Sequence, residues 1–488
     1  MKKKSLKKNA AYSFIKAFMN LAFPLISFPY ASRVLLPAGI GKVNFANSII
    51  DYFILIAGLG ISSYASREAV RVRDDKHLLN KIFREILAIN LISTLISYTL
   101  LVFALLFVNK FYEYRILLIV CSTKVLFTTI GVDWIFKVEE EYKYITIRSI
   151  FFQFTSLILL FVFVHNQNDY IVYAFIGVFS SVGSNICNIF YSRRFVNFFE
   201  KTTLNIKKHL KPIFIFFGMS VATRLYTALD SVMLGFIMDD NAVGYYSAAN
   251  KIKSLAVGLI TAIISTLLPR ASYYLGKNKE AEYKKIISKA FDFTCYFSIP
   301  AAIGTMSIAK PLILVFSGKD FLGALVPMLV ISPVIIFISI SSFADNIVLL
   351  PQKLEKISLQ AQIAGAVFNI ALNYFMIPRW GVFGAAFSTF LVEFLVTFYK
   401  IFFSFRFLYK LIFFKNLIKV VASSIFMSIC IFALIFFVKS VFMQLILGIF
   451  IGIFTYAFTT VLLKNDTALI LLNTIRNNIR KIRLYRKV

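Results

Sequence analysis

The sequence predicts an all-α integral membrane protein with about fourteen transmembrane helices. Hydrophobic residues make up 59% of the 488 residues and charged residues only 16%, and the mean hydropathy is +0.78. One water-soluble core cannot bury this much apolar surface, so lipid must solvate the rest. The apolar runs extend over about 20 residues without the period-two alternation of barrel strands, and backbone groups in hydrocarbon must be paired within the chain. Helices are therefore the expected spanning elements.

The apolar stretches form a first set of six, a second set of six and a final two. They lie at 12–35, 43–65, 84–107, 114–136, 145–164 and 170–191, then at 212–237, 243–268, 289–316, 324–350, 358–377 and 381–403, and last at 417–438 and 441–463. This order predicts a six-helix bundle in residues 1–200, a second in 201–411, and two additional helices with a basic tail in 412–488. The first stretch lacks a small-residue cleavage site, so we expect an uncleaved span.

The distribution of Lys and Arg predicts the orientation of these spans. With a cytoplasmic N-terminus, the inner segments, counted to include Lys419 at the start of its span, hold 36 basic residues, and the outer segments, counted to include Arg33 at the end of its span, hold 6. Short cytoplasmic loops are the basic ones in membrane proteins. Both termini are therefore expected in the cytoplasm. The net charge of +30 is spread over these loops and forms no single basic face, so we expect no nucleic-acid partner.

Cysteine and histidine give no sign of a metal site or a disulfide framework. The four cysteines fall in separate apolar stretches, and the three histidines fall in loops without ligand-like spacing. These residues are Cys121, Cys187, Cys295 and Cys430, and His77, His165 and His209. We predict no catalytic residue and no metal ligand.

Basic residues inside the spans are the candidates for binding an anionic substrate. Lys124, Arg224, Lys251 and Lys253 lie deep, where a charge costs a few kcal/mol unless it faces water or a partner. Arg224, near the middle of its span, is the predicted anchor. Residues at or near span ends complete the set, although snorkelling to the headgroups is the alternative for them. They are Lys16, Arg33, Arg67 and Arg270.

Acidic residues inside the spans are fewer than basic ones, and two roles are open for them. They either couple transport to a proton or sodium gradient or neutralise buried cations, and they are Asp51, Asp133, Asp230, Asp292, Asp345 and Glu393. The candidates for coupling are Asp133, Asp230, Asp345 and Glu393. Arg224 and Asp230 lie six residues apart, about 240° around a helix, so they do not pair simply. If Arg224 has a structural role, an acidic residue such as Asp133 or Asp345 is its expected partner.

The two halves of the chain share a weak repeat at an offset of 203 residues. Gly41 corresponds to Gly244, Ala46 to Ala249, Asn47 to Asn250 and Arg67 to Arg270. Six spans return the chain to its starting side, so the halves would share one orientation about an axis along the membrane normal. Such paired bundles place a substrate cavity between them.

Four segments, taken in order, carry a resemblance to a known family. They read SRVLLPAGIG (32–41), GVDWIFKVEEEYKYITIR (131–148), LDSVMLG followed by VGYYSAA (229–235 and 243–249), and IPRWGVFGAA (377–386). On a scaffold of six, six and two spans they resemble the Wzx-type polysaccharide flippases of the multidrug/oligosaccharidyl-lipid/polysaccharide exporter superfamily. The sequence departs from that pattern at Leu36 and Pro37, where Leu-Gly is usual.

The resemblance implies a V-shaped, MATE-like pair of bundles that works by alternating access in a bacterial cytoplasmic (inner) membrane. The implied substrate is a polyprenyl-pyrophosphate-linked oligosaccharide repeat unit for a surface polysaccharide such as O-antigen or capsule. The pathway's polymerase and glycosyltransferases are then possible partners. Lys and Arg in a low-dielectric cavity would hold a pyrophosphate through charge-assisted hydrogen bonds.

Three other functions are compatible with a polytopic membrane protein. An ion-coupled multidrug exporter of the same superfamily carries cationic drugs and should line its cavity with carboxylates. The residues deep in the spans here are mainly Lys and Arg. A membrane polysaccharide polymerase commonly needs a large external loop, and the longest outer connections here have around ten residues. A structural scaffold would leave the deep Lys and Arg unexplained. No phosphate-binding GxxxxGK[ST] sequence supports ATP hydrolysis, so no cofactor is expected.

Overall fold

The computed structural model describes residues 6–198, 204–408 and 414–485, and every regular element within these ranges is a helix. The predicted all-α membrane fold is confirmed. Contacts divide the chain into two compact units, Met1–Ser247 and Ala248–Val488, and each is described by itself. The predicted bundle limits at residues 200 and 411 stay a prediction, because this grouping follows contacts and not membrane topology.

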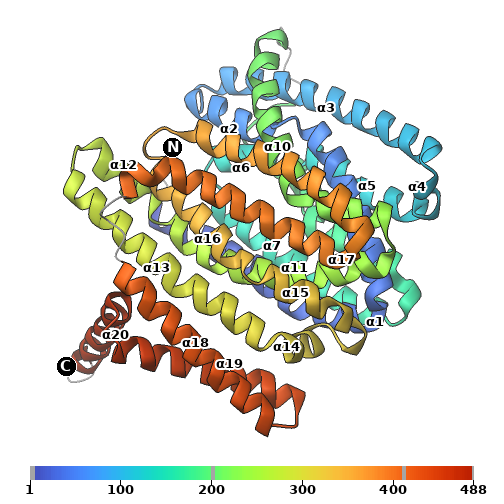
Figure 1. The fold of residues 1–488 in the computed structure, drawn as a ribbon. Coiled ribbons are helices and arrows are strands. Elements are labelled where there is room, and N and C mark those ends of the chain that lie inside the picture. Colours follow the sequence, from blue (N-terminus) through green and yellow to red (C-terminus); the bar gives the residue numbers. More distant parts are fainter. Residues whose placement is uncertain (1–5, 199–203, 409–413, 486–488) are drawn as a thin grey trace. The chain divides into compact units, whose positions relative to one another are not determined.

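The first unit is built from ten α-helices and two short irregular turns of helix (Figure 1). The elements are α1 (Leu6–Gly58), α2 (Ile61–Arg71), α3 (Lys76–Phe107), α4 (Asn109–Glu113), α5 (Arg115–Ile130), α6 (Asp133–Val138), α7 (Tyr142–Phe163), the 3₁₀ turn η1 (Gln167–Asp169), α8 (Tyr170–Val178), the π-helix η2 (Phe179–Gly183), α9 (Asn185–Ser192) and α10 (Lys207–Ile237). The helix α11 (Asp240–Ser265) begins in this unit and continues into the second.

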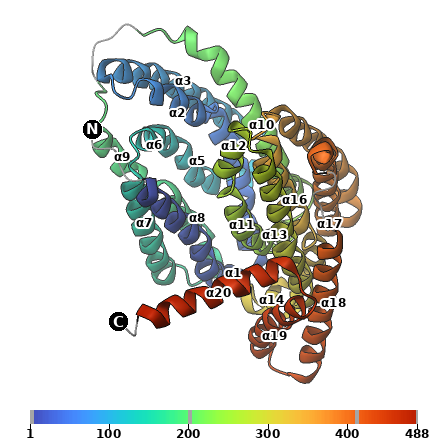
Figure 2. The same ribbon diagram turned by 90° about the vertical axis from the view of Figure 1, so that its left-hand side faces the viewer.

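Helix α1 is the organising element of the first unit. It contacts α3, α5, α7, α8 and α10, and Figure 2 shows α5, α7 and α8 alongside it. A kink at Leu36, whose φ of 58° lies outside the helical region, divides α1 into two halves. A residue before proline is disfavoured in the α conformation, so Pro37 explains why the kink falls here. The predicted break between the first two spans is therefore present, although the helix resumes without a loop.

Two glycines allow α1 and α11 to cross at very short range within the first unit. A Cβ atom on Gly41 would lie 1.8 Å from the Asp240 carbonyl oxygen, and one on Gly244 would lie 2.2 Å from that of Pro37. Only glycine fits such a contact between backbones. The repeat had paired these two residues across the halves, and the structure gives both the same role in one crossing.

The second unit continues α11 and adds nine α-helices with two irregular segments. They are α12 (Leu268–Gly276), α13 (Glu280–Ser307), α14 (Ala309–Phe316), the 3₁₀-helix η3 (Lys319–Ala324), α15 (Leu325–Ile331), α16 (Val334–Phe343), the π-helix η4 (Ala344–Leu349), α17 (Glu355–Leu408), α18 (Phe414–Phe437), α19 (Val441–Leu462) and α20 (Asp466–Tyr485). Helices α13, α18 and α19 lie side by side and share a buried cluster that includes Cys295, Met427 and Ile431 (Figure 1). Within the second unit, α18 and α19 thus pack against α13 through apolar side chains.

The count of fourteen spans is not confirmed. In the described ranges, nine helical stretches are long and apolar enough to cross a membrane, or eleven if two bent pairs each form one span. Two of the nine, Ala11–Arg71 and Glu355–Phe405, each contain two predicted spans, because the chain bends at Leu36 and at Gly381 without leaving the helix. The predicted span 114–136 falls on α5 and α6, and neither is long enough to count alone.

Candidate functional site

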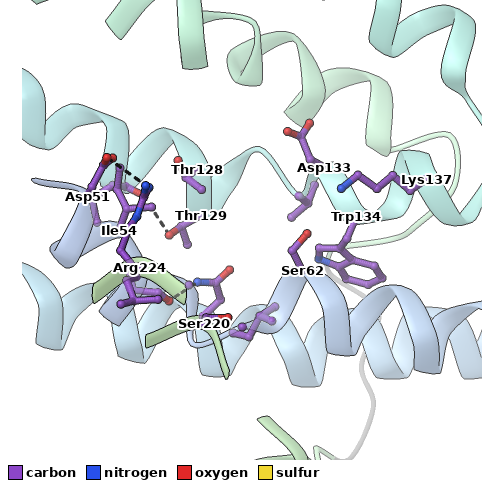
Figure 3. A pocket seen from close by; sticks show the side chains of 18 residues that line it. Asp51, Ile54, Ser62, Thr128, Thr129, Asp133, Trp134, Lys137, Ser220 and Arg224 are labelled. Carbon is purple, nitrogen blue, oxygen red and sulfur yellow. Dashed lines mark hydrogen bonds and ion pairs between the residues drawn. The ribbon is translucent and has the colours of Figure 1, made fainter. Parts of the chain in front are cut away.

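The first unit encloses a polar cavity of about 320 Å³ between α1, α2, α3, α5, α6 and α10. Figure 3 shows its side chains converging from these helices. Half of the eighteen lining residues carry a charge, a hydroxyl or an amide group: Asp51, Ser62, Asn90, Thr128, Thr129, Asp133, Lys137, Ser220 and Arg224. Such groups are costly in a membrane protein unless they face water or a ligand. The cavity is therefore the candidate functional site.

Arg224 and Asp51 form the first charged end of the cavity. The guanidinium Nη2 of Arg224 lies 3.3 Å from the Asp51 carboxylate oxygen Oδ2, and the two side chains are 37% and 32% exposed (Figure 3). Arg224 was expected to balance Asp133 or Asp345 if its role were structural. That choice of partner was wrong, because α1 brings Asp51 to the facing position. Both side chains remain open to the cavity.

Lys124 lies behind this first end. Its ammonium group donates to the Asn47 side-chain oxygen at 2.6 Å, and it interacts electrostatically with Asp51. Lys124 comes from α5 and Asn47 from α1, so the hydrogen bond ties these helices together beside the cavity. Two cations, Arg224 and Lys124, thus share the single carboxylate of Asp51.

Asp133 marks the opposite end of the cavity and is held by a buried polar network. Arg148 Nη2 lies 3.0 Å from Asp133 Oδ1, and the Asn188 amide donates to the same oxygen at 2.8 Å. Arg148 also donates to the Asn188 side-chain oxygen. Because Arg148 is only 6% exposed, this ion pair neutralises a buried cation, which is one of the two roles foreseen for Asp133.

A strained turn between α5 and α6 sets the position of Asp133. Val132 has a φ of 38° and a ψ of 39°, which is a rare conformation for a β-branched residue. The Asn188 amide donates to the Gly131 carbonyl at 2.7 Å, and the Asn185 amide donates to that of Phe127 at 2.9 Å. These bonds from α9 fix the turn. Strain of this kind persists where the surroundings over-determine it, and it is concentrated at functional sites.

Lys137 and Trp134 complete the second end. Trp134 is 5% exposed and packs against Phe83, while the Lys137 side chain is exposed and lines the cavity. The sequence analysis did not select Trp134, Lys137 or Arg148 as a site residue, and it considered Asp51 only among the acidic residues inside the spans. The signal was present: three of these four fall in the 131–148 segment that carries the family resemblance.

The other predicted cations do not line this cavity. Lys16 is half-buried on α1 and interacts with Asp133 and Arg148. Arg33 is exposed and donates to the Pro29 carbonyl at 2.6 Å. Arg67 lies over the ring of Phe216, with 5.1 Å from its guanidinium carbon to the ring centre.

The second unit contains the remaining predicted cations. Lys251 and Lys253 are half-buried on α11. Arg270 lies over the ring of Tyr274 at 5.7 Å and also donates to its hydroxyl at 3.3 Å. Arg67 and Arg270, which the repeat had paired, thus make the same kind of contact with an aromatic ring, each in its own unit.

The remaining acidic candidates are buried or half-buried. Asp230 accepts a hydrogen bond from the Tyr246 hydroxyl. Asp345 lies in the π-helix η4, and its Oδ2 accepts from Lys400 at 2.7 Å. Glu393 is buried on α17. Asp345, like Asp133, therefore neutralises a buried lysine or arginine. No group of three or more His, Cys, Asp or Glu residues in the described ranges could hold a metal ion.

An all-helical membrane fold with a cavity lined by charged, hydroxyl and amide side chains is typical of a transporter. The chain belongs to the family described as "Polysaccharide biosynthesis protein", whose model matches residues 6–275, and the MatE model matches residues 215–375. The predicted resemblance to the polysaccharide flippases is thereby confirmed.

Several known proteins are similar to the chain. It is 25% identical over 396 residues to the "Putative O-antigen transporter" of Escherichia coli K12, covering 80% of this chain and 94% of that protein. It is 28% identical over 174 residues to the "Probable flippase AglR" of Haloferax volcanii, covering 34% of this chain and 35% of the other. Among solved structures, "Lipid II flippase MurJ, inward closed conformation" matches with a TM-score of 0.73 and 18% identity, covering 94% of this chain and 99% of that one. This last likeness establishes the shared fold.

Proposed function

We propose that this protein is a flippase that moves a polyprenyl-pyrophosphate-linked oligosaccharide repeat unit from the cytoplasmic to the outer leaflet of a bacterial inner membrane. The family to which the chain belongs and its similarity to the O-antigen transporters support the class of substrate. The observation that carries the proposal is the polar cavity inside the first unit, with charged side chains at both ends and hydroxyl and amide groups between them.

The cavity's chemistry suits an anionic saccharide. The guanidinium group of Arg224 is planar and always charged, and its N–H donors match the geometry of phosphate oxygens. It can therefore bind a pyrophosphate. Along the cavity, Ser62, Thr128 and Ser220 supply hydroxyl groups that can exchange hydrogen bonds with sugar hydroxyls. Lys124 adds positive charge behind Arg224. We propose Arg224 as the phosphate anchor, with Lys124 raising the local positive potential.

A drug exporter of the same superfamily is the main alternative, and the charges of the cavity argue against it. A cationic drug needs an available carboxylate, but Asp51 faces Arg224 and Asp133 faces Arg148. Each cavity carboxylate is thus matched by an arginine. An enzymatic role, such as a polysaccharide polymerase, is the second alternative, and the transporters among the relatives favour transport instead of catalysis.

We propose that a proton or sodium gradient drives the cycle through embedded carboxylates, with Asp133, Asp230, Asp345 and Glu393 as the candidates. Asp133 and Asp345 face Arg148 and Lys400, and Asp230 accepts a hydrogen bond from Tyr246. The predicted topology places both termini in the cytoplasm. The pathway's glycosyltransferases and polymerase would then supply and consume the substrate on opposite sides of the membrane.

Deletion of the gene in its host tests this proposal. Cells without the protein should lose the surface glycan and accumulate the lipid-linked repeat unit in the inner leaflet, because synthesis continues while translocation stops. The amount of lipid-linked repeat unit is measured in membrane extracts, and its orientation with a membrane-impermeant glycosidase. Restoring the wild-type gene is the control. Unchanged surface glycan in the deletion strain would contradict the proposal.

A further inference from the structure

The two ends of the cavity differ in how their charges are balanced. At the first end, Arg224 faces Asp51 at 3.3 Å. At the second end, the carboxylate of Asp133 is taken by Arg148 and Asn188. Lys137 lines the cavity at this end, yet no carboxylate of the described residues forms an ion pair with it.

The acidic residues that follow Lys137 in the sequence are directed to another cation. Glu140 Oε1 lies 3.0 Å from Arg73 Nη1, and Glu139 Oε2 lies 3.9 Å from Arg73 Nε. Arg73 comes from the connection after α2, so these contacts hold the α6–α7 turn to that connection. The charges of Glu139 and Glu140 are thereby directed to Arg73 and not to Lys137.

Other cations lie close to this second end. Lys16 on α1 interacts electrostatically with Lys137, Arg148 and Asp133. Three cations therefore share the one carboxylate of Asp133 within the described residues. Like charges repel, and an additional anion relieves that repulsion. The α6 end thus carries the larger excess of positive charge, with three cations to one carboxylate, whereas Arg224 and Lys124 share Asp51 at the first end.

We propose that Lys137 forms a second anion-binding subsite, which takes an oxyanion of the same substrate that Arg224 contacts. This inference rests on the proposed function and adds a second point of attachment to it. The ligand is a phosphate oxygen of the pyrophosphate or the carboxylate of an acidic sugar. An ammonium group can meet either geometry, because it is a compact charge with three donors on a flexible stem. The Ser62 hydroxyl lines the same end of the cavity (Figure 3).

Tryptophan fluorescence can report directly on this subsite. The chain has two tryptophans, Trp134 and Trp380, and Trp134 lines the cavity beside Lys137. A Trp380→Phe variant of the full-length purified protein leaves Trp134 as the sole reporter. This parent is titrated separately with inorganic pyrophosphate and with glucuronate, alone and with Lys137→Gln. Lys143→Gln is the matched control, because Lys143 is an exposed lysine six positions further along the chain, on α7, that does not line the cavity.

We expect Lys137→Gln to weaken binding of at least one probe about tenfold, as loss of one charged hydrogen bond implies, while Lys143→Gln leaves both titrations unchanged. Weaker binding of pyrophosphate alone identifies the diphosphate as the ligand, and weaker binding of glucuronate alone identifies an acidic sugar. Equal binding by Lys137→Gln and the parent would overturn the subsite. If Lys137→Gln binds normally but Arg224→Gln still loses pyrophosphate binding, the proposed function stands and only the Lys137 subsite is rejected.

Discussion

The Arg224–Asp51 pair gives the sharpest prediction, because its effects on stability and on binding should separate. Both side chains are about one-third exposed, so the pair resembles a surface ion pair more than a buried one. Such pairs contribute about 0.2–1 kcal/mol to stability. Neutralising either partner with Arg224→Gln or Asp51→Asn should therefore shift the melting temperature by no more than about 4 °C.

Binding should respond much more strongly, and in opposite directions for the two variants. Arg224→Gln removes a charged hydrogen bond to the ligand, which costs about 1.5–3 kcal/mol, or roughly ten- to a hundredfold in affinity. Arg224→Lys should recover part of this loss, because it keeps the charge without the planar fork. Asp51→Asn should tighten binding of a phosphate, because the carboxylate 3.3 Å from Arg224 competes with it.

The assay combines thermal unfolding of each purified variant with pyrophosphate titration and with export of the glycan in cells at matched protein abundance. The double variant should bind like Arg224→Gln alone, because Asp51 acts through Arg224. Two results would refute the reasoning: normal binding and export by a normally abundant Arg224→Gln protein, or loss of folded protein in both single variants. The second result would mean that the pair is structural.

Three further predictions follow from other parts of the chain. Asp133→Asn should lower the abundance of folded protein, measured by quantitative immunoblotting of membranes, because it leaves Arg148, which is 6% exposed, as a buried cation without its carboxylate, and this costs up to about 3–5 kcal/mol; abundance equal to wild type would contradict the network around Asp133. Gly41→Ala should reduce the melting temperature, because its Cβ would lie 1.8 Å from the Asp240 carbonyl oxygen, whereas Gly58→Ala, where nothing lies within 4 Å of the added atom, should not. Reporter fusions after residues 75, 200, 280 and 410 should give cytoplasmic signals and those after 167 and 240 external ones; opposite signals at two or more sites would reject the predicted topology.

The sequence was sufficient for the fold class and the family, because both depend on patterns that are local in the chain. Apolar runs of membrane length identify helices from neighbouring residues alone. The break before Pro37 was also predictable, since proline restricts the residue before it. The number of spans was harder to establish. Whether a helix bends or ends at Leu36 or Gly381 depends on packing against other helices, which is not a local property.

Partners within the site could not be read from the sequence, because they join residues far apart in the chain. Arg224 was correctly selected as a deep cation that lines a cavity, but its partner Asp51 lies on α1, 173 positions away in the sequence. Lys137 was missed because the predicted spans place it in the inner segment 137–144, where lysines usually reflect topology, whereas the structure places it in α6. Its importance depends on Arg73, which forms ion pairs with Glu139 and Glu140. The sequence around Lys137 does not show where these glutamates are directed.

Translocation by the purified protein in lipid vesicles tests the central claim most directly. A lipid-linked oligosaccharide extracted from the host is reconstituted with the protein, and its exposure to a membrane-impermeant glycosidase is followed over time. We predict that wild-type protein makes the inner-leaflet pool accessible far faster than protein-free vesicles do, and that Arg224→Gln protein at equal density does not. Equal rates in vesicles with and without wild-type protein, under every imposed proton or sodium gradient, would contradict the account.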